Sequence, residues 1–300
     1  LAVRAGRGLF ARETTTWSHD AAVQQKIANR LGWLSSPALM AESVGAVKAF
    51  AEGVRRDGFT DVVLLGMGGS SLAPEVLRAV LGGSPGWPTL HMLDSTDPAA
   101  VLAIATDPKT TLYLLASKSG TTIEPNSLAA HFIRVLQEAG VPRWADHFVA
   151  ITDPGTELAK RAEAEGFRHT FINPADIGGR FSALSYFGIV PSALMGQDIE
   201  ALVQWGLDML TEAQMSSGDP TTNPAVGLGL LMAAGALNGR DKLTLIVPPA
   251  LEAFGLWVEQ LVAESTGKQG VGVVPIAGEV LSDPSSYGAD RVFVRLRVTG

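Results

Sequence analysis

From residue 61 onward, short apolar runs alternate with stretches of helical spacing. The runs are DVVLLG at 61–66, TLHMLD at 89–94, TLYLLA at 111–116, HFVAI at 147–151 and RHTFI at 168–172. Apolar runs without alternation are typical of parallel strands that helices cover on both faces. The pattern therefore predicts βαβ units and a doubly wound parallel sheet of the α/β class.

Helical spacing dominates the chain on either side of this block. Apolar side chains share one stripe over 21–34, and a second helical stretch follows at 38–56. After residue 197 we expect helices near 198–215, 223–238 and 251–266, with strands at 243–247, 271–276 and 292–298. These patterns divide the chain into an N-terminal helical segment (1–58), to which we assign packing and no chemistry, a first domain (59–196) and a second domain (197–300). The second domain has few strands, so we expect it to be truncated.

The amino-acid composition limits the location and the partners expected for this chain. The 300 residues are 46% hydrophobic and contain no cysteine, which is consistent with a cytoplasmic location. No apolar run approaches the roughly 20 residues of a membrane span. The net charge of −7 disfavours nucleic acid as a partner. Any anionic ligand must therefore be held by local positive charge.

The most unusual stretch is SKSGTT at 117–122, which lies between an apolar strand and a helical segment that starts near Pro125. Backbone N–H groups and the positive end of a helix dipole meet at such a point. The hydroxyls add donors, and Lys118 adds a full charge. A simple turn is the alternative, but a turn requires fewer Ser, Thr and Gly residues than stand here. The stretch favours a phosphate site.

The loop GMGGSS at 66–71 allows two interpretations. It resembles part of the dinucleotide-binding fingerprint, and Asp94 stands where a ribose-binding acid would lie, although the third glycine of the fingerprint is absent. Alternatively, Gly68 and Gly69 let the backbone approach a small phosphorylated ligand while Ser70 donates a hydroxyl. If the strands before this loop and before SKSGTT are neighbours, both loops converge on one phosphate.

Two later stretches carry further candidate chemistry. In IGGRFSAL at 177–184, Arg180 could offer a planar set of donors to an oxyanion, or it could be a surface residue in a turn. In the predicted helix at 251–266, Gln260 and Glu264 are one turn apart. Glu264 lies in the last turn, where the helix dipole disfavours a carboxylate. It could act as a general base or be a solvated helix end, and the spacing leaves both open.

Taken in order, GMGGSSL, ASKSGTT, IGGRFSALS and EQLVAESTGK resemble the motifs of the glucose-6-phosphate isomerase family. That family is built from two sugar isomerase domains of the doubly wound type, and the resemblance covers the chain from about residue 61. The segment TWSHDAAVQQKIANRLGWL also resembles the start of the isomerase half of bifunctional transaldolase/glucose-6-phosphate isomerases. The resemblance implies aldose–ketose isomerisation of glucose 6-phosphate and fructose 6-phosphate through an enediolate, in glycolysis and gluconeogenesis, with no metal or other cofactor.

The resemblance also implies roles for residues at matching positions. Glu264 would move a proton between C2 and C1, and Arg180 would stabilise the enediolate. The implied substrate- and phosphate-binding residues are Gly69, Ser70, Ser117, Lys118, Ser119, Thr122, Gly179 and Gln260. The family's ring-opening His and late catalytic Lys lie after the Glu motif, whereas His19, His91, His131, His147 and His169 all precede it. We therefore expect this chain to bind sugar phosphate and to be a poorly active fragment.

Other functions and partners stay open. The chain could be a non-catalytic regulatory module that binds sugar phosphate, or an NAD-dependent oxidoreductase that uses the 66–71 loop and Asp94. The expected partner is a small sugar phosphate, with no nucleic acid and no membrane. A fused transaldolase domain and a homodimer are further expectations from the resemblance.

Overall fold

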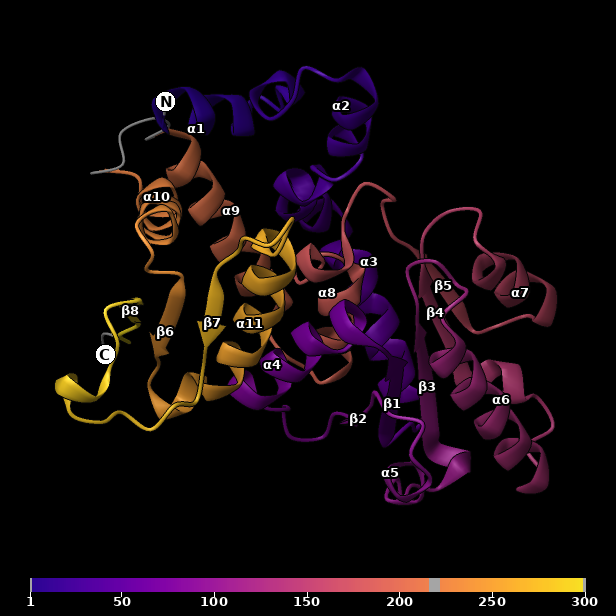
Figure 1. Cartoon of the computed structure of the whole chain (residues 1–300). Coiled ribbons are helices and arrows are strands. Elements are labelled where there is room, and N and C mark those ends of the chain that lie inside the picture. Colours follow the sequence, from indigo (N-terminus) through magenta and orange to yellow (C-terminus); the bar gives the residue numbers. More distant parts are fainter. Residues whose placement is uncertain (1, 216–221, 299–300) are drawn as a thin grey trace. The chain divides into compact units, whose positions relative to one another are not determined.

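The computed structural model describes residues 2–215 and 222–298, and these form two compact units (Figure 1). One unit consists of Asn29–Leu207. The other combines Leu1–Ala28 with Asp208–Gly300. We refer to Asn29–Leu207 as the sheet unit and to the other as the split unit. None of the helices in the described ranges has the length and apolar character needed to span a bilayer.

The sheet unit is built on five parallel strands. In chain order they are β1 (Asp61–Gly66), β2 (Thr89–Leu93), β3 (Thr111–Ala116), β4 (Phe148–Thr152) and β5 (His169–Ile172). Their order across the sheet is β2-β1-β3-β4-β5, and every neighbouring pair is parallel. The predicted doubly wound parallel sheet is therefore confirmed.

Helices cover both faces of this sheet, and Figure 1 shows α6 (Ile123–Glu138) and α7 (Glu157–Glu165) on one side of the strands. They pack on one set of alternating strand residues, namely Val63, Leu65, Tyr113, Leu115, Phe148 and Ala150. The other set packs against α3 (Ser36–Arg56) and α8 (Tyr186–Leu194), and consists of Val62, Leu64, Leu112, Leu114, Val149 and Ile151. Because both sets are buried, the strand sequences are apolar throughout instead of alternating.

The sheet unit also contains two further helices and several 3₁₀ turns. They are the α-helices α4 (Leu72–Leu81) and α5 (Pro98–Leu102), with the 3₁₀ turns η2 (Gly32–Ser35), η3 (Gly68–Ser70), η4 (Pro108–Thr110), η5 (Trp144–His147) and η6 (Gly179–Phe181). Local side chains fix where helices begin. The Asp97 carboxylate accepts the N–H of Ala99 at 2.7 Å at the start of α5, and the Thr156 hydroxyl accepts the N–H of Ala159 at 3.2 Å at the start of α7.

The split unit contains a smaller parallel sheet of order β7-β6-β8. Its strands are β6 (Lys242–Ile246), β7 (Val274–Ile276) and β8 (Arg291–Arg295), and its helices include α1 (Ala2–Phe10), α2 (Ala21–Ala28), α10 (Pro224–Leu237) and α11 (Glu252–Thr266). Short 3₁₀ turns lie at η1 (Thr14–Thr16), η7 (Pro249–Leu251) and η8 (Pro284–Ser286). Leu243, Leu245 and Val273 form its buried core. The predicted strands of this region are present with shifted ends.

The predicted boundaries at 58/59 and 196/197 differ from those of the compact units, which lie at 28/29 and 207/208. The first difference arises because α3 packs on the main sheet, where Val44 and Val47 are buried in its core. The second arises because α9 (Ile199–Met215) begins inside the sheet unit, where Ile199 and Val203 join the same core. An amphipathic pattern shows that a helix packs, but not which sheet it packs on.

The central strand β3 yields a stability prediction. Leu114 has no exposed surface, so Leu114→Ala should leave a cavity and lower the free energy of unfolding by about 2–5 kcal/mol. Urea unfolding followed by circular dichroism measures this. The same substitution at Leu102, which is 80% exposed, is the control and should change stability by less than about 0.5 kcal/mol. Equal effects at the two positions would contradict the assigned core.

Candidate active site

A pocket of about 450 Å³ lies at the carboxyl ends of the central strands. In the order β2-β1-β3-β4-β5 the chain reverses direction across the sheet between β1 and β3, and ligands of doubly wound folds bind at this switch point. Gly66 at the end of β1 pairs with Ala116 at the end of β3, so the loops that follow them emerge side by side. The predicted convergence of these two loops is confirmed.

Seven of the predicted substrate- and phosphate-binding residues line this pocket. They are Gly69, Ser70, Ser117, Lys118, Ser119, Thr122 and Gly179, and the other lining residues are Met67, Ala116, Asp153, Pro154, Thr156 and Ala175. Arg180 is the neighbour of Gly179 in η6 but is not among the lining residues. Its guanidinium carbon lies 5.0 Å from the centre of the Phe181 ring.

The loop at 117–122 is fixed by its own hydroxyl groups. The Ser117 hydroxyl lies 3.1 Å from that of Thr122 and accepts the backbone N–H of Gly120 at 3.2 Å. Gly120 has φ of 71°, and a Cβ there would lie 2.8 Å from the backbone nitrogen of Leu158. Only glycine fits this position without strain. The loop leads directly into α6, whose first turn contributes unpaired N–H groups and the positive end of its dipole.

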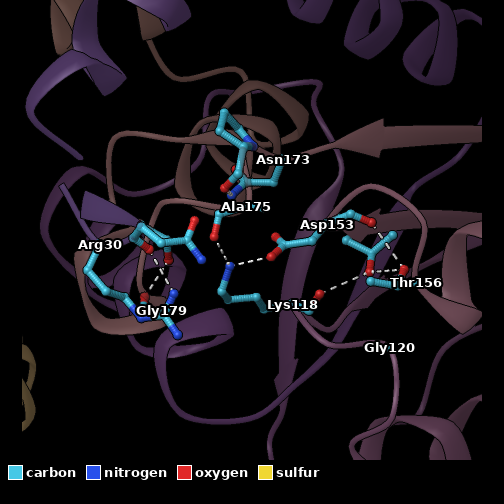
Figure 2. A network of polar contacts seen from close by, with 12 residues as sticks. Arg30, Lys118, Gly120, Asp153, Thr156, Asn173, Ala175 and Gly179 are labelled. Carbon is cyan, nitrogen blue, oxygen red and sulfur yellow. Dashed lines mark hydrogen bonds and ion pairs between the residues drawn. The ribbon is translucent and has the colours of Figure 1, made fainter. Parts of the chain in front are cut away.

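The Lys118 side chain contacts residues that follow the next two strands, β4 and β5 (Figure 2). Its ammonium group pairs with the Asp153 carboxylate after β4 and donates to the carbonyl oxygen of Ala175 after β5 at 2.9 Å. Asp153 is only 8% exposed, and burial raises the pKa of its carboxyl group. The Lys118 ammonium opposes this rise in pKa, and Asn173 and Arg30 oppose it more weakly.

The β4–α7 turn holds the Lys118 backbone as well as its side chain. The backbone N–H of Asp153 donates to the Lys118 carbonyl oxygen at 3.2 Å. The Thr152 hydroxyl donates to the same oxygen at 3.3 Å, and the Thr156 hydroxyl lies 2.8 Å from that of Thr152. The predicted cation is therefore tied to a neighbouring loop at both ends of its side chain.

Sequence reasoning missed these supporting residues, namely Arg30, Asp153, Thr156, Asn173 and Ala175. The motif TDPGT at 152–156 directly follows an apolar strand, as SKSGTT does, and that position was the available signal. Arg30 lies in the segment to which no chemistry was assigned. Figure 2 shows Arg30 and Gly179 on one side of Lys118, and Asp153 and Thr156 on the other.

The two glycine loops touch each other directly. A Cβ on Gly69 would lie 2.3 Å from the carbonyl carbon and oxygen of Gly179, and the Ser182 hydroxyl donates to the Gly69 carbonyl oxygen at 3.3 Å. We expected Gly69 to permit approach of a ligand. The structure shows that its missing side chain permits close approach of the segment Gly179–Arg180.

The remaining predicted site residues lie in the split unit. Gln260 and Glu264 are on α11, one turn apart, as the sequence predicts. The side-chain oxygen of Gln260 is buried and has no hydrogen-bond partner among the described residues. Glu264 is exposed near the end of the helix, and its backbone carbonyl accepts a hydrogen bond from the Lys268 ammonium.

Asp94, on which the dinucleotide interpretation depends, lines a different pocket. This second pocket, of about 470 Å³, lies beside β2 and also includes Ser71 and His91. A ribose-binding acid has to share a pocket with the glycines that approach the pyrophosphate. Gly69 lines the first pocket, whereas the pocket of Asp94 takes Ser71 but no glycine from the 66–71 loop, so the geometry does not favour the dinucleotide interpretation.

The fold and the pocket define a class, a doubly wound α/β protein whose polar loops gather at the switch point of its sheet. The family model of phosphoglucose isomerase matches residues 40–286. The chain belongs to the phosphoglucose isomerase family, which confirms the resemblance seen in the motifs and the sugar-isomerase type of the fold.

Individual comparisons agree with the family assignment. A glucose-6-phosphate isomerase of Trichormus variabilis is 32% identical over 263 residues, which cover 79% of this chain and 49% of that protein. A crystal structure of a hypothetical protein from Thermus thermophilus matches with a TM-score of 0.79 at 29% identity, covering 98% of this chain and 69% of that one. The glucose-6-phosphate isomerase of Chlamydia trachomatis matches with a TM-score of 0.64 at 25% identity, covering 91% and 50%. This chain spans about half the length of the curated relatives it matches.

The glycine contact yields a matched pair of substitutions. Gly69→Ala should force the two loops apart and lower the free energy of unfolding by about 1–3 kcal/mol, the cost of overpacking. Gly179→Ala should change it by less than about 0.5 kcal/mol, because a Cβ there has no atom within 4 Å. Thermal or urea unfolding of both variants tests this. A Gly69→Ala variant as stable as Gly179→Ala would show that the loops separate at no cost.

Proposed function

We propose that the protein interconverts glucose 6-phosphate and fructose 6-phosphate, with the pocket of the sheet unit holding the phosphate. The observation that carries this proposal is the gathering of seven residues, predicted from two separate loops and the glycine–arginine turn, around one pocket at the switch point. Membership of the phosphoglucose isomerase family supports it. Hydroxyls, the α6 N-terminus and the Lys118 ammonium together suit a phosphate dianion.

The proposed reaction needs a base and an oxyanion stabiliser. Glu264 removes the proton from C2 of the open-chain sugar and returns it to C1 while the hydroxyl proton of O2 passes to O1, so the carbonyl moves by one carbon and no oxidant is consumed. Arg180 stabilises the negative charge on the enediolate oxygens, and Gln260 contacts the substrate. These roles rest on matching positions in the family motifs and on the placement of Gln260 and Glu264 one turn apart on α11.

The finer expectations about the whole protein are also part of this proposal. The reaction would serve glycolysis and gluconeogenesis, in the cytoplasm. A homodimer and a fused transaldolase domain are proposed from the motif resemblance. The N-terminal helical segment (1–58) and the two sugar isomerase domains (59–196 and 197–300) are kept as a proposal for how this region of the family is organised.

Lys118 provides a direct test of the phosphate site. Lys118→Ala should weaken binding of fructose 6-phosphate by about 1.5–3 kcal/mol, because it removes a hydrogen bond between two charged groups. Isothermal titration calorimetry measures this. Lys109→Ala removes the same charge from an exposed position on η4 and should leave the affinity unchanged. Unchanged affinity in Lys118→Ala would mean that the 117–122 loop is only a turn.

Glu264 provides a test of the chemistry. In a form of the protein that turns over, Glu264→Gln should reduce kcat by roughly 10²–10⁴ with little change in substrate affinity, since the amide cannot accept the C2 proton. A coupled isomerase assay measures the rate. Glu252→Gln, at the other end of α11, loses the same charge and should retain activity. Near wild-type turnover in Glu264→Gln would move the base elsewhere.

A further inference from the structure

The Lys118 ammonium group has three N–H bonds, and each can donate a hydrogen bond. One is directed at the Asp153 carboxylate and one at the Ala175 carbonyl oxygen, at 2.9 Å. The described residues supply no third acceptor that would compete for the remaining N–H. Two fixed acceptors determine the orientation of a tetrahedral ammonium group, so the third N–H has a defined direction.

Burial of the Asp153 carboxylate in this position costs free energy of desolvation. Asp153 is only 8% exposed, its Oδ1 is buried without a hydrogen-bond partner among the described residues, and burial raises the pKa of its carboxyl group. A buried carboxylate with an unsatisfied oxygen adds little net stability, because its desolvation cost offsets the attraction to its partner. Packing therefore does not explain why an acid lines a pocket suited to an anion.

The backbone around Asp153 is held in place independently of its carboxylate. Its N–H donates to the Lys118 carbonyl oxygen at 3.2 Å, and its own carbonyl oxygen accepts the Thr156 hydroxyl at 3.1 Å. The side chain can therefore be changed while the turn that carries it keeps its hydrogen bonds.

We propose that Asp153 is a positioning residue for Lys118: together with the Ala175 carbonyl it occupies two of the three ammonium protons and leaves the third for the phosphate of the sugar. This inference rests on the proposed function, because it assigns a role within the phosphate site. Without the carboxylate, the flexible four-carbon side chain of Lys118 would sample several orientations, and ordering it on ligand binding would reduce affinity.

Repulsion between Asp153 and the phosphate must be distinguished from positioning of Lys118 by experiment. A carboxylate at the pocket wall also repels a phosphate dianion, so a purely repulsive Asp153 would make every neutral replacement bind more tightly. Positioning predicts a different pattern. Asp153→Asn keeps an oxygen that can accept from Lys118, whereas Asp153→Ala does not.

The experiment measures fructose 6-phosphate binding by calorimetry for the wild-type chain, Asp153→Asn, Asp153→Ala, Lys118→Ala and the double variant Lys118→Ala/Asp153→Ala. Asp153→Ala should bind roughly 5- to 50-fold more weakly, within the coupling range for residues in contact, and Asp153→Asn should stay within about threefold of wild type. In the Lys118→Ala background, Asp153→Ala should change the affinity by less than about twofold. Glu157→Gln, which removes an exposed carboxylate paired with Lys160 in the first turn of α7, should have no effect.

Three binding results would each contradict the proposed positioning role of Asp153. Tighter or unchanged binding by Asp153→Ala would show that the carboxylate does not position Lys118. A loss that persists in full without Lys118 would assign Asp153 a general structural role, and equal loss in Asp153→Asn and Asp153→Ala would show that the acceptor oxygen is not what matters. If the wild-type chain does not bind fructose 6-phosphate, the proposed function fails and this inference fails with it.

Discussion

The pairing of β1 with β3 is the constraint on which the site depends. β2 forms at the edge of the sheet, and the chain then returns across β1 to place β3 on its other side. This reversal brings the carboxyl ends of two central strands together, with Gly66 opposite Ala116. Both strands are buried on two faces, so their register is fixed by packing, and a slip of one residue would exchange the side chains between the faces. The position of the two polar loops follows from that apolar register.

Lys118 places a positive charge at the pocket, whereas the net charge of the whole chain is negative. The net charge is −7, which would repel a phosphate dianion at long range. Screening by salt weakens that repulsion over about 8–10 Å, whereas Lys118 lies within the pocket itself. The buried carboxylate of Asp153 limits what Lys118 contributes by attraction alone. The value of Lys118 to a ligand therefore depends on its direction as much as on its charge.

The sheet and most of the pocket could be predicted from the sequence because they depend on short-range patterns. Buried parallel strands give continuous apolar runs, and SKSGTT interrupts one of them with residues that few turns require. For Asp153 the sequence offers only a weak signal, since TDPGT follows an apolar strand but is otherwise typical of an ordinary turn, and its partner Lys118 lies 35 residues away in the chain. The contact of Gly69 with Gly179 is hidden for the same reason, because sequence patterns do not show which loops meet. The boundaries of the compact units could not be predicted either, because the sequences of α3 and α9 show an apolar stripe but not the sheet on which that stripe packs.

The orientation of Arg180 shows how packing far from the 117–122 loop can support the candidate site. Gly69 has no side chain, so the backbone of η6 lies directly against the loop after β1. Within η6, the Arg180 guanidinium lies over the ring of Phe181, and that ring stacks on Trp33 at a centroid distance of 5.8 Å and an interplanar angle of 18°. Trp33 comes from the N-terminal segment, for which the sequence pattern predicts packing and no chemistry. That packing is sufficient to orient Arg180 for the role proposed for it, because supporting contacts hold a functional side chain in one orientation.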